Sequence, residues 1–185
     1  MIEQIIGDEE IRMQKVVTAL ARELATIRTG RATPSLVEHI KVDYHGAPTP
    51  IKQIASISIP EVKMILIQPW DRTSLSSIEK AILKSDTGLN PTNDGNVIRM
   101  AIPDLTEERR RELAKVVRKK LEEIRISLRN LRRDGIEKLR QAERNKDVSQ
   151  DQYTRASDQL QKLTDGFIDK VNQIGVNKEA EIMEV

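Results

Sequence analysis

Basic side chains recur at close spacing in the segment from Thr106 to Asp147, and most of them are arginine. The guanidinium group is planar, always charged and able to make two parallel hydrogen bonds to a phosphate. Arginines that share one face would therefore bind the backbone of a nucleic acid. The residues that could do so are Arg111, Lys115, Arg118, Arg125, Arg129, Arg132, Arg133 and Arg140.

The same segment predicts one long helix that would place these residues on one flank. With Ile124 at zero and about 100° per residue, a set of small and apolar residues falls within roughly 60° of it. These residues are Leu113, Val117, Leu121, Leu128, Leu131, Gly135, Leu139 and Ala142. They recur about every 3.6 residues, the period of a straight helix rather than the 3.5 of a long supercoil. We therefore expect a compact bundle.

Charges on this predicted helix are largely segregated by sign. The basic residues lie at roughly 80° to 180° from Ile124, while the opposite flank carries Glu108, Glu112, Glu123, Asp134 and Glu137. A solvated face tied by pairs such as Glu122 and Arg125 is the alternative. Pairing within a helix needs opposite signs three or four residues apart, so the segregation favours phosphate binding.

The composition limits the function classes. With 31 basic and 29 acidic residues, the net charge is only +2, so any basic surface is local. Cysteine is absent, which excludes disulfides and thiolate metal sites, and no signal peptide or long apolar run is present. We expect a soluble, cytoplasmic protein without a membrane partner. Aromatic residues make up 2% of the chain, too few to stack single-stranded bases, so structured RNA is the expected ligand.

Residues for catalysis or cofactor binding are scarce. His39 and His45 are too far apart along an extended strand to share one metal ion. Thr106 can cap a helix whose first turn holds Glu107 and Glu108. Trp70 fits a packed or half-exposed strand end better than a stacking platform. The sequence also lacks both common glycine-rich nucleotide-binding motifs. We therefore expect a protein that is not an enzyme and has no metal or cofactor.

Three segments predict amphipathic helices that must cover one another. They are Ile2 to Thr29, Thr106 to Asp147, and a helix that starts at the capping box of Ser149 with Gln152. Residues 1–29 and 106–185 would form a monomeric three-helix bundle.

Between them, residues 30–105 predict an inserted small α/β domain, rich in strands, so that the fold class is α+β. Its expected strands are His39 to Tyr44, Ile51 to Ile59, Val62 to Gln68 and Asn96 to Ile102. We also expect a turn over Gly46 to Pro50, a helix over Ser74 to Ser85 and a hairpin turn over Asn90 to Gly95.

Two linkers join the expected domains, at residues 29–34 and 102–105. Gly30 can adopt positive φ, and Pro34 disfavours helical geometry at Thr33. Neighbouring linkers predict a two-strand hinge, although a rigid interface remains the alternative. The hinge residues are Thr29, Gly30, Arg31, Pro34, Ile102, Pro103, Asp104 and Leu105.

Four motifs in order, IRTGRATPS from Ile27, AILKSDTGLNP from Ala81, LTEERR from Leu105 and RNLRRD from Arg129, closely resemble the ribosome recycling factor family. The resemblance implies an L-shaped protein that acts after termination with elongation factor G and GTP to separate ribosomal subunits. It also implies that Arg110, Arg129 and Arg132 contact the RNA of the large subunit. Gly135 stands where the family pattern has alanine, and we expect it to soften the helix by about 1 kcal/mol.

Two other classes stay open at this point. A coiled-coil interaction protein would require the helices to associate between chains, which sedimentation would detect. An RNA-modifying enzyme would require a catalytic constellation, for which the sequence offers no candidate.

The bundle should fold without the insert, because each apolar stripe has its partners in residues 1–29 and 106–185. A chain that joins these two segments by a short flexible linker should be helical by circular dichroism, should unfold cooperatively and should still bind ribosomes. A molten product would mean that the insert is part of the bundle core.

Overall fold

A computed structural model describes residues 1–184, which form an α+β protein as predicted. The chain divides into two compact units. Unit 1 comprises residues 1–24 and 111–180, and unit 2 comprises residues 25–110 and 181–184.

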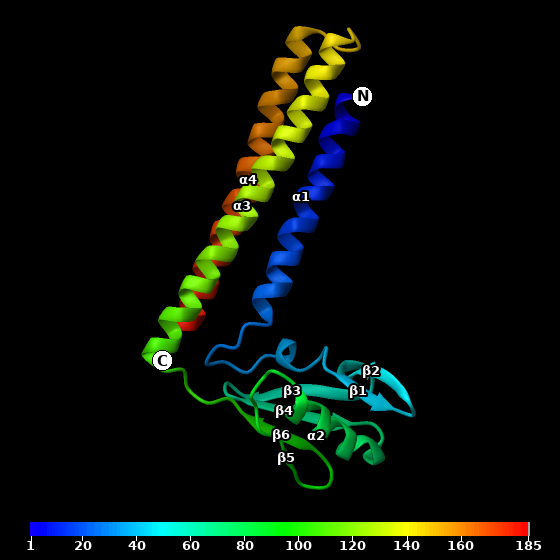
Figure 1. Cartoon of the computed structure of the whole chain (residues 1–185), viewed down its shortest axis with the longest axis vertical. Helices are drawn as coiled ribbons and strands as arrows, with labels where there is room; N and C mark the ends of the chain where they lie inside the picture. Colours follow the sequence, from blue (N-terminus) through cyan, green and yellow to red (C-terminus); the bar gives the residue numbers. More distant parts are fainter. Residues whose placement is uncertain (185) are drawn as a thin grey trace. The chain divides into compact units, whose positions relative to one another are not determined.

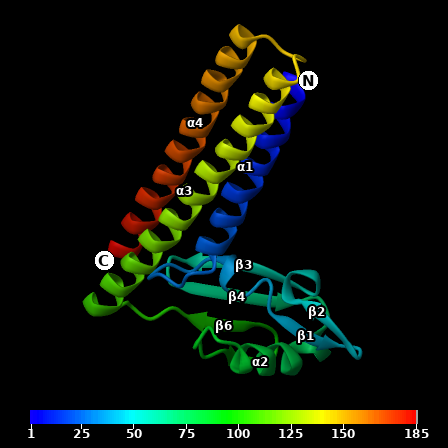
Figure 2. The ribbon, with the colours of Figure 1, turned by 45° about the horizontal axis from the view of Figure 1, so that its top comes forward.

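Three long helices run side by side in unit 1 (Figures 1 and 2). They are α1 (Ile2–Ala25), α3 (Glu107–Arg144) and α4 (Gln150–Met183). Helix α3 is antiparallel to both neighbours. Along α1 it pairs Lys138 with Glu9 and Lys120 with Glu23, and along α4 it bonds Glu179 through Arg118 and Gln161 through Arg132. The apolar stripe of α3 is thus covered by helices of the same chain. The alternative of a coiled-coil protein required this stripe to be covered by another chain.

The predicted apolar stripe of α3 is confirmed. All eight of its members are buried, and Ile124, the reference position, is half-buried. Leu128 and Leu139 are fully buried, as are Leu20 of α1 and Leu160 of α4. Burying one such leucine contributes about 1.5 to 3 kcal/mol to the stability of unit 1.

The predicted caps of the long helices are also present. The hydroxyl of Thr106 accepts a hydrogen bond from the backbone N–H of Arg109 at 3.1 Å. At the start of α4, the Ser149 hydroxyl accepts from the Gln152 N–H at 3.1 Å, and the Gln152 side chain accepts from the Ser149 N–H at 2.8 Å. Both bonds of a capping box are therefore made.

Helix α1 ends at Ala25, four residues before the predicted end at Thr29. The side chain of Thr29 is buried and donates a hydrogen bond to Glu181 Oε1 at 2.9 Å. Its hydroxyl also accepts from the Arg31 N–H at 3.3 Å. These bonds hold the segment in a non-helical path, which the amphipathic pattern alone could not indicate.

Unit 2 contains a hairpin, a four-stranded antiparallel sheet and one α-helix (Figure 1). The hairpin pairs β1 (Lys41–Tyr44) with β2 (Ala47–Pro50). The sheet has the order β3-β4-β6-β5, with β3 Ala55–Glu61, β4 Met64–Pro69, β5 Thr92–Asn93 and β6 Ile98–Ala101. Helix α2 spans Leu75–Lys84, and short 3₁₀ helices cover Pro34–Leu36, Ile51–Gln53 and Arg72–Ser74.

The central strand β4 carries the core of unit 2. Its residues Ile65 and Ile67 are fully buried, whereas Met64 and Leu66 on the other face are half-buried. Ile78 of α2 and Met100 of β6 are fully buried in the same cluster. Burial is thus greater on the face of Ile65 and Ile67 than on the opposite face of β4.

Three predictions within unit 2 were wrong in their bounds. The hairpin turn expected over Asn90 to Gly95 overlaps strand β5 at Thr92–Asn93, and the chain turns between Asn93 and Ile98 instead. A turn was expected over Gly46 to Pro50, but only His45 and Gly46 form it, both at positive φ. Ala47–Pro50 therefore pairs as strand β2. Positive φ at both central positions is the geometry that matches the twist of a hairpin. The strand expected from Ile51 begins at Ala55 instead, because Ile51–Gln53 forms a 3₁₀ helix.

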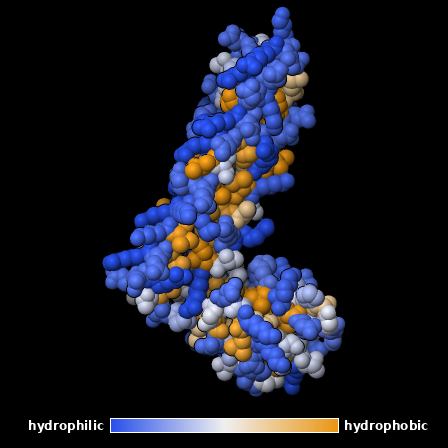
Figure 3. Space-filling view, in the orientation of Figure 1, coloured by the Kyte–Doolittle hydropathy of each residue, from blue (hydrophilic) through white to orange (hydrophobic). Residues whose placement is uncertain are grey.

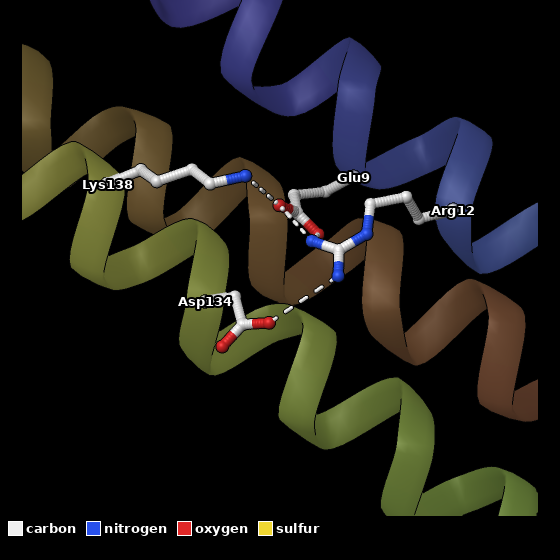
Figure 4. Close-up of polar contacts among 4 residues, drawn as sticks. All are labelled: Glu9, Arg12, Asp134 and Lys138. Carbon is white, nitrogen blue, oxygen red and sulfur yellow. Dashed lines mark hydrogen bonds and ion pairs between the residues drawn. The ribbon is translucent and has the colours of Figure 1, made fainter.

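A buried carboxylate lies inside the bundle, a feature that the amphipathic pattern of α1 does not predict. Glu9 is fully buried and accepts hydrogen bonds from Lys138 Nζ at 2.8 Å and from Arg12 Nη1 at 3.2 Å (Figure 4). Arg12 Nη2 also lies 3.7 Å from Asp134 Oδ2. Two cations thus offset the cost of removing this charge from water.

Gly135 makes room for that carboxylate. A Cβ atom at this position would lie 2.6 Å from Leu160 Cδ2 and 3.0 Å from Glu9 Cγ. The absence of a side chain therefore lets α1 and α4 approach α3 closely. The close packing of the three helices explains why residue 135 is a glycine. The prediction of local softening did not include this contact.

Replacing two helical glycines by alanine should give opposite results. Gly166→Ala should raise the free energy of unfolding by about 0.5 to 1 kcal/mol, because alanine is the better helix former and its Cβ would meet nothing within 4 Å. Gly135→Ala should lower it, because overpacking costs about 1 to 3 kcal/mol and exceeds that gain. Denaturant unfolding of both variants measures the difference. Equal stabilisation by both substitutions would refute the packing role of Gly135.

Candidate nucleic-acid interface

A row of three arginines lies along the seam between α3 and α4. They occur every seven residues, which corresponds to a rise of about 10 Å per step along the helix. Each donates a hydrogen bond to a side chain of α4. The pairs are Arg118 Nε with Glu179 Oε1 at 2.9 Å, Arg125 Nε with Asn172 Oδ1 at 2.9 Å, and Arg132 Nη1 with Gln161 Oε1 at 3.0 Å.

Arg129 and Arg133 extend this row on the solvent side. Arg129 Nη1 lies 3.4 Å from Glu122 Oε1, and Arg125 Nη1 donates to the other oxygen of that carboxylate at 3.1 Å. Arg133 is exposed and makes no side-chain hydrogen bond or ion pair to any residue in 1–184. The structure thus brings together five of the six predicted arginines on one flank of α3.

These arginines keep free donors. A guanidinium has five N–H groups, of which Arg132 uses one and Arg125 two in the bonds above. The pair Glu122 and Arg125, which the alternative of a solvated face requires, is present. One carboxylate cannot neutralise both Arg125 and Arg129, however, and the flank retains positive charge.

The acidic flank of α3 has a different neighbour. This flank faces α1, and its Asp134 lies near Arg12 of α1. Two lysines of α3 at the edge of the flank pair with acidic residues of α1. These pairs are Lys138 with Glu9 and Lys120 with Glu23. Ion pairing with α1 therefore occupies this side, and the arginines remain on the side that meets α4 and solvent.

A hollow of about 210 Å³ opens on the seam between α3 and α4. Arg118 and Arg125 line it from α3, and Val176 lines it from α4 with an exposed side chain. Gly175 also lines the hollow. A Cβ at this position would collide with the side chain of Leu121, so the two helices can pack this closely only at a glycine. Hydrophilic residues predominate on the face of the bundle seen in Figure 3, with apolar side chains between them.

Arg110 is not part of this row. It lies in the first turn of α3, belongs to unit 2 and is half-buried. It lines a cavity of about 60 Å³ together with Gly30, Lys63 and Asp104, and its Nε atom is buried without a hydrogen-bond partner among the described residues. Its surroundings thus differ from those of Arg129 and Arg132.

The two predicted hinge segments are anchored at neighbouring points of unit 2. The N–H of Ala32 donates to the carbonyl of Val62 at 2.7 Å, and the N–H of Ile102 donates to the carbonyl of Lys63 at 2.7 Å. The ammonium of Lys63 also pairs with Asp104, and this hydrogen bond lowers the pKa of the Asp104 carboxyl. Both segments therefore leave the sheet beside the turn that joins β3 and β4.

The first of these segments also contacts residues 181–184. Besides the bond from Thr29 to Glu181, Arg31 pairs with Glu184, and this hydrogen bond lowers the pKa of the Glu184 carboxyl. Gly30 does not adopt positive φ, contrary to the expectation, and a Cβ there would meet nothing within 4 Å.

The remaining predicted hinge residues differ in burial and local structure. Pro34 opens a 3₁₀ helix, and its carbonyl accepts from the N–H of Glu38 at 2.9 Å. Ile102 is buried, Leu105 is half-buried, and Pro103 is exposed.

Residues considered for other chemistry lie apart. His39 pairs with Glu38, and His45 packs edge-on against Tyr44. Trp70 is 69% exposed, so the prediction of a packed or half-exposed residue was wrong; strand β4 ends at Pro69, before the indole. Within residues 1–184 no cluster of three potential metal ligands occurs, and no helix there is long and apolar enough to cross a membrane.

Comparison with known proteins gives one consistent result. The family model described as "Ribosome recycling factor" matches residues 20–183. The ribosome-recycling factor of Dehalococcoides mccartyi is 54% identical over 185 residues, and that of Syntrophomonas wolfei is 53% identical over 185 residues, with both chains fully covered in each case.

Two solved structures are similar over the whole chain. A solution structure of ribosome recycling factor has a TM-score of 0.81 at 47% identity, covering 100% of this chain and 98% of the other. Models for the T. thermophilus ribosome recycling factor and the E. coli elongation factor G bound to the E. coli post-termination complex include a chain with a TM-score of 0.71 at 42% identity, with both chains fully covered. The fold, the four motifs and these matches agree, and the chain belongs to the ribosome recycling factor family.

Proposed function

We propose that this protein is a translation factor that binds the post-termination ribosome and, with elongation factor G and GTP, promotes separation of the subunits. Family membership over the full length of the chain carries this proposal. A relative of the same fold is described together with elongation factor G on a post-termination complex, which supports the same partners here. The large ribosomal subunit and its RNA are the expected binding surface.

The arginine-rich flank of α3 is the part of the chain best suited to contact that RNA. Its members are Arg118, Arg125, Arg129, Arg132 and Arg133, with Arg110 as a separate contact near the start of the helix. Arg129 and Arg132 are three residues apart and thus adjacent on the helix surface, so they could span neighbouring phosphates. Few aromatic residues are available for stacking, which favours recognition of the RNA backbone.

The factor acts without chemistry of its own. Its sequence contains neither common glycine-rich nucleotide-binding motif, so the energy for subunit separation must come from the partner GTPase. Such a factor works in the cytoplasm, where ribosomes and elongation factor G meet.

Segments 29–34 and 102–105 would serve as the hinge that lets the two domains move relative to each other. Their bonds to the adjacent residues Val62 and Lys63 support this proposal, because both segments then leave the sheet at nearly the same place. Two segments that leave one point together can rotate with little strain.

Arg132→Ala and Arg129→Ala should each weaken binding to ribosomes by roughly 1 to 3 kcal/mol, because each removes a charge-assisted contact. Helicity and melting temperature should change little, since neither side chain belongs to the buried stripe. The dependence of log K on log salt should flatten by somewhat under one per lost phosphate contact. Equilibrium binding at several salt concentrations measures both quantities.

Glu123→Ala, on the opposite flank, is the control and should leave affinity and salt dependence unchanged. If Arg132→Ala binds with unaltered affinity and salt dependence, the basic flank is only a solvated face.

Gly30→Val tests the hinge. The substitution narrows the range of φ and ψ that residue 30 can explore, but its Cβ would meet no atom within 4 Å, so the protein should fold normally. Subunit splitting with elongation factor G and GTP should therefore slow more than ribosome binding weakens. Equal loss of both activities, or of neither, at an unchanged melting temperature would argue against a moving joint at this position.

A further inference from the structure

We propose that Asn172 and Gln161 of α4 are positioning residues for RNA binding, which hold the guanidinium groups of Arg125 and Arg132 ready for phosphate. The inference rests on the proposed function and adds two residues of a different helix to the binding surface. Neither residue belongs to one of the four motifs, and only the packing of α4 against α3 brings them to the arginines.

At Arg125 the side-chain amide of Asn172 bonds the Nε–H of the guanidinium. The Nε–H donates to Asn172 Oδ1 at 2.9 Å, and Nη1 donates to Glu122 Oε2 at 3.1 Å. Bonds at both Nε and Nη1 fix the plane of the group as well as its position. The Nη2 donors remain free, and the side chain is 25% exposed, so a phosphate can reach it from solvent.

At Arg132 the amide is itself held in one orientation. Gln161 Nε2 donates to Asp165 Oδ1 at 2.9 Å, one turn further along α4. Its carbonyl oxygen Oε1 therefore faces α3 and accepts from Arg132 Nη1 at 3.0 Å. Arg132 keeps four of its five donors for another ligand.

The neutrality of these two partners matters for RNA binding. Arg118, the third member of the row, is held by Glu179, whose carboxylate offsets the positive charge that attracts phosphate. Asn172 and Gln161 accept a hydrogen bond without adding a negative charge. They therefore orient their arginines without a further negative charge, although Arg125 also shares the carboxylate of Glu122 with Arg129.

Orientation lowers the cost of binding. An arginine side chain has many rotamers, and it loses that freedom when a ligand fixes it. A side chain that is already held in the free protein avoids part of that cost. Removing the amide should weaken binding by about 2- to 10-fold through this effect.

The competing explanation is that these bonds only join α3 to α4. Double-mutant cycles on the full-length protein separate the two roles. Asn172→Ala and Gln161→Ala should each weaken binding to purified large ribosomal subunits by about 2- to 10-fold. Added to Arg125→Ala, Asn172→Ala should cause no further loss, and Gln161→Ala should likewise cause none in Arg132→Ala.

Gln173→Ala is the matched control on α4. Its amide bonds Asn177 at 2.8 Å within the same helix, so its loss should not change binding. The melting temperature provides a second readout. Asn172→Ala and Gln161→Ala should weaken binding with little change in melting temperature, because exposed side-chain bonds contribute little to folding. Bonds that only joined the helices would lower the melting temperature and leave binding unaltered.

Outcomes that overturn the inference differ from those that overturn the proposed function. If Arg125→Ala and Arg132→Ala weaken binding but the amide substitutions have no effect, or add in full to the arginine substitutions, the arginines bind RNA without help from α4. If the arginine substitutions themselves leave binding intact, both the RNA-binding surface and the positioning role are refuted.

Discussion

Burial of the apolar stripe of α3 is the constraint on which the bundle depends. The stripe has the period of a straight helix, so it can stay buried along the whole length of unit 1 only if two other helices flank it. Helix α1 covers one edge and α4 the other, and the polar residues on either side of the stripe must then meet those neighbours. The two flanks of α3 are consequently different surfaces with different partners.

On the α1 side the contact includes a fully buried carboxylate. Glu9 is held by Lys138 and Arg12, and Gly135 leaves the space that it occupies. A charge in such a place is tolerated only while its partners remain, because an unpaired buried charge costs several kcal/mol. This cluster therefore sets the register of α1 on α3 more narrowly than apolar packing alone would.

On the α4 side the contact is polar but exposed, and its geometry suits binding rather than stability. Exposed ion pairs and hydrogen bonds contribute little to folding, yet three arginines at equal intervals are each held by a residue of α4. The bundle thus serves as a rigid support that presents cations along one edge. In the proposed function, this edge contacts the RNA of the large ribosomal subunit.

Periodicity in the sequence was enough to predict the three helices, the buried stripe of α3, the caps at Thr106 and Ser149 and the side of α3 on which the arginines lie. These features depend on residues close together in the chain. The end of α1 at Ala25, the 3₁₀ helix at Ile51–Gln53 and the exposure of Trp70 were not predictable, because distant hydrogen bonds or the exact end of a strand decide them. Only the tertiary structure brings Gly135 against Glu9 and places Asn172 and Gln161 beside the arginines, since these contacts join residues of different helices and leave no local pattern.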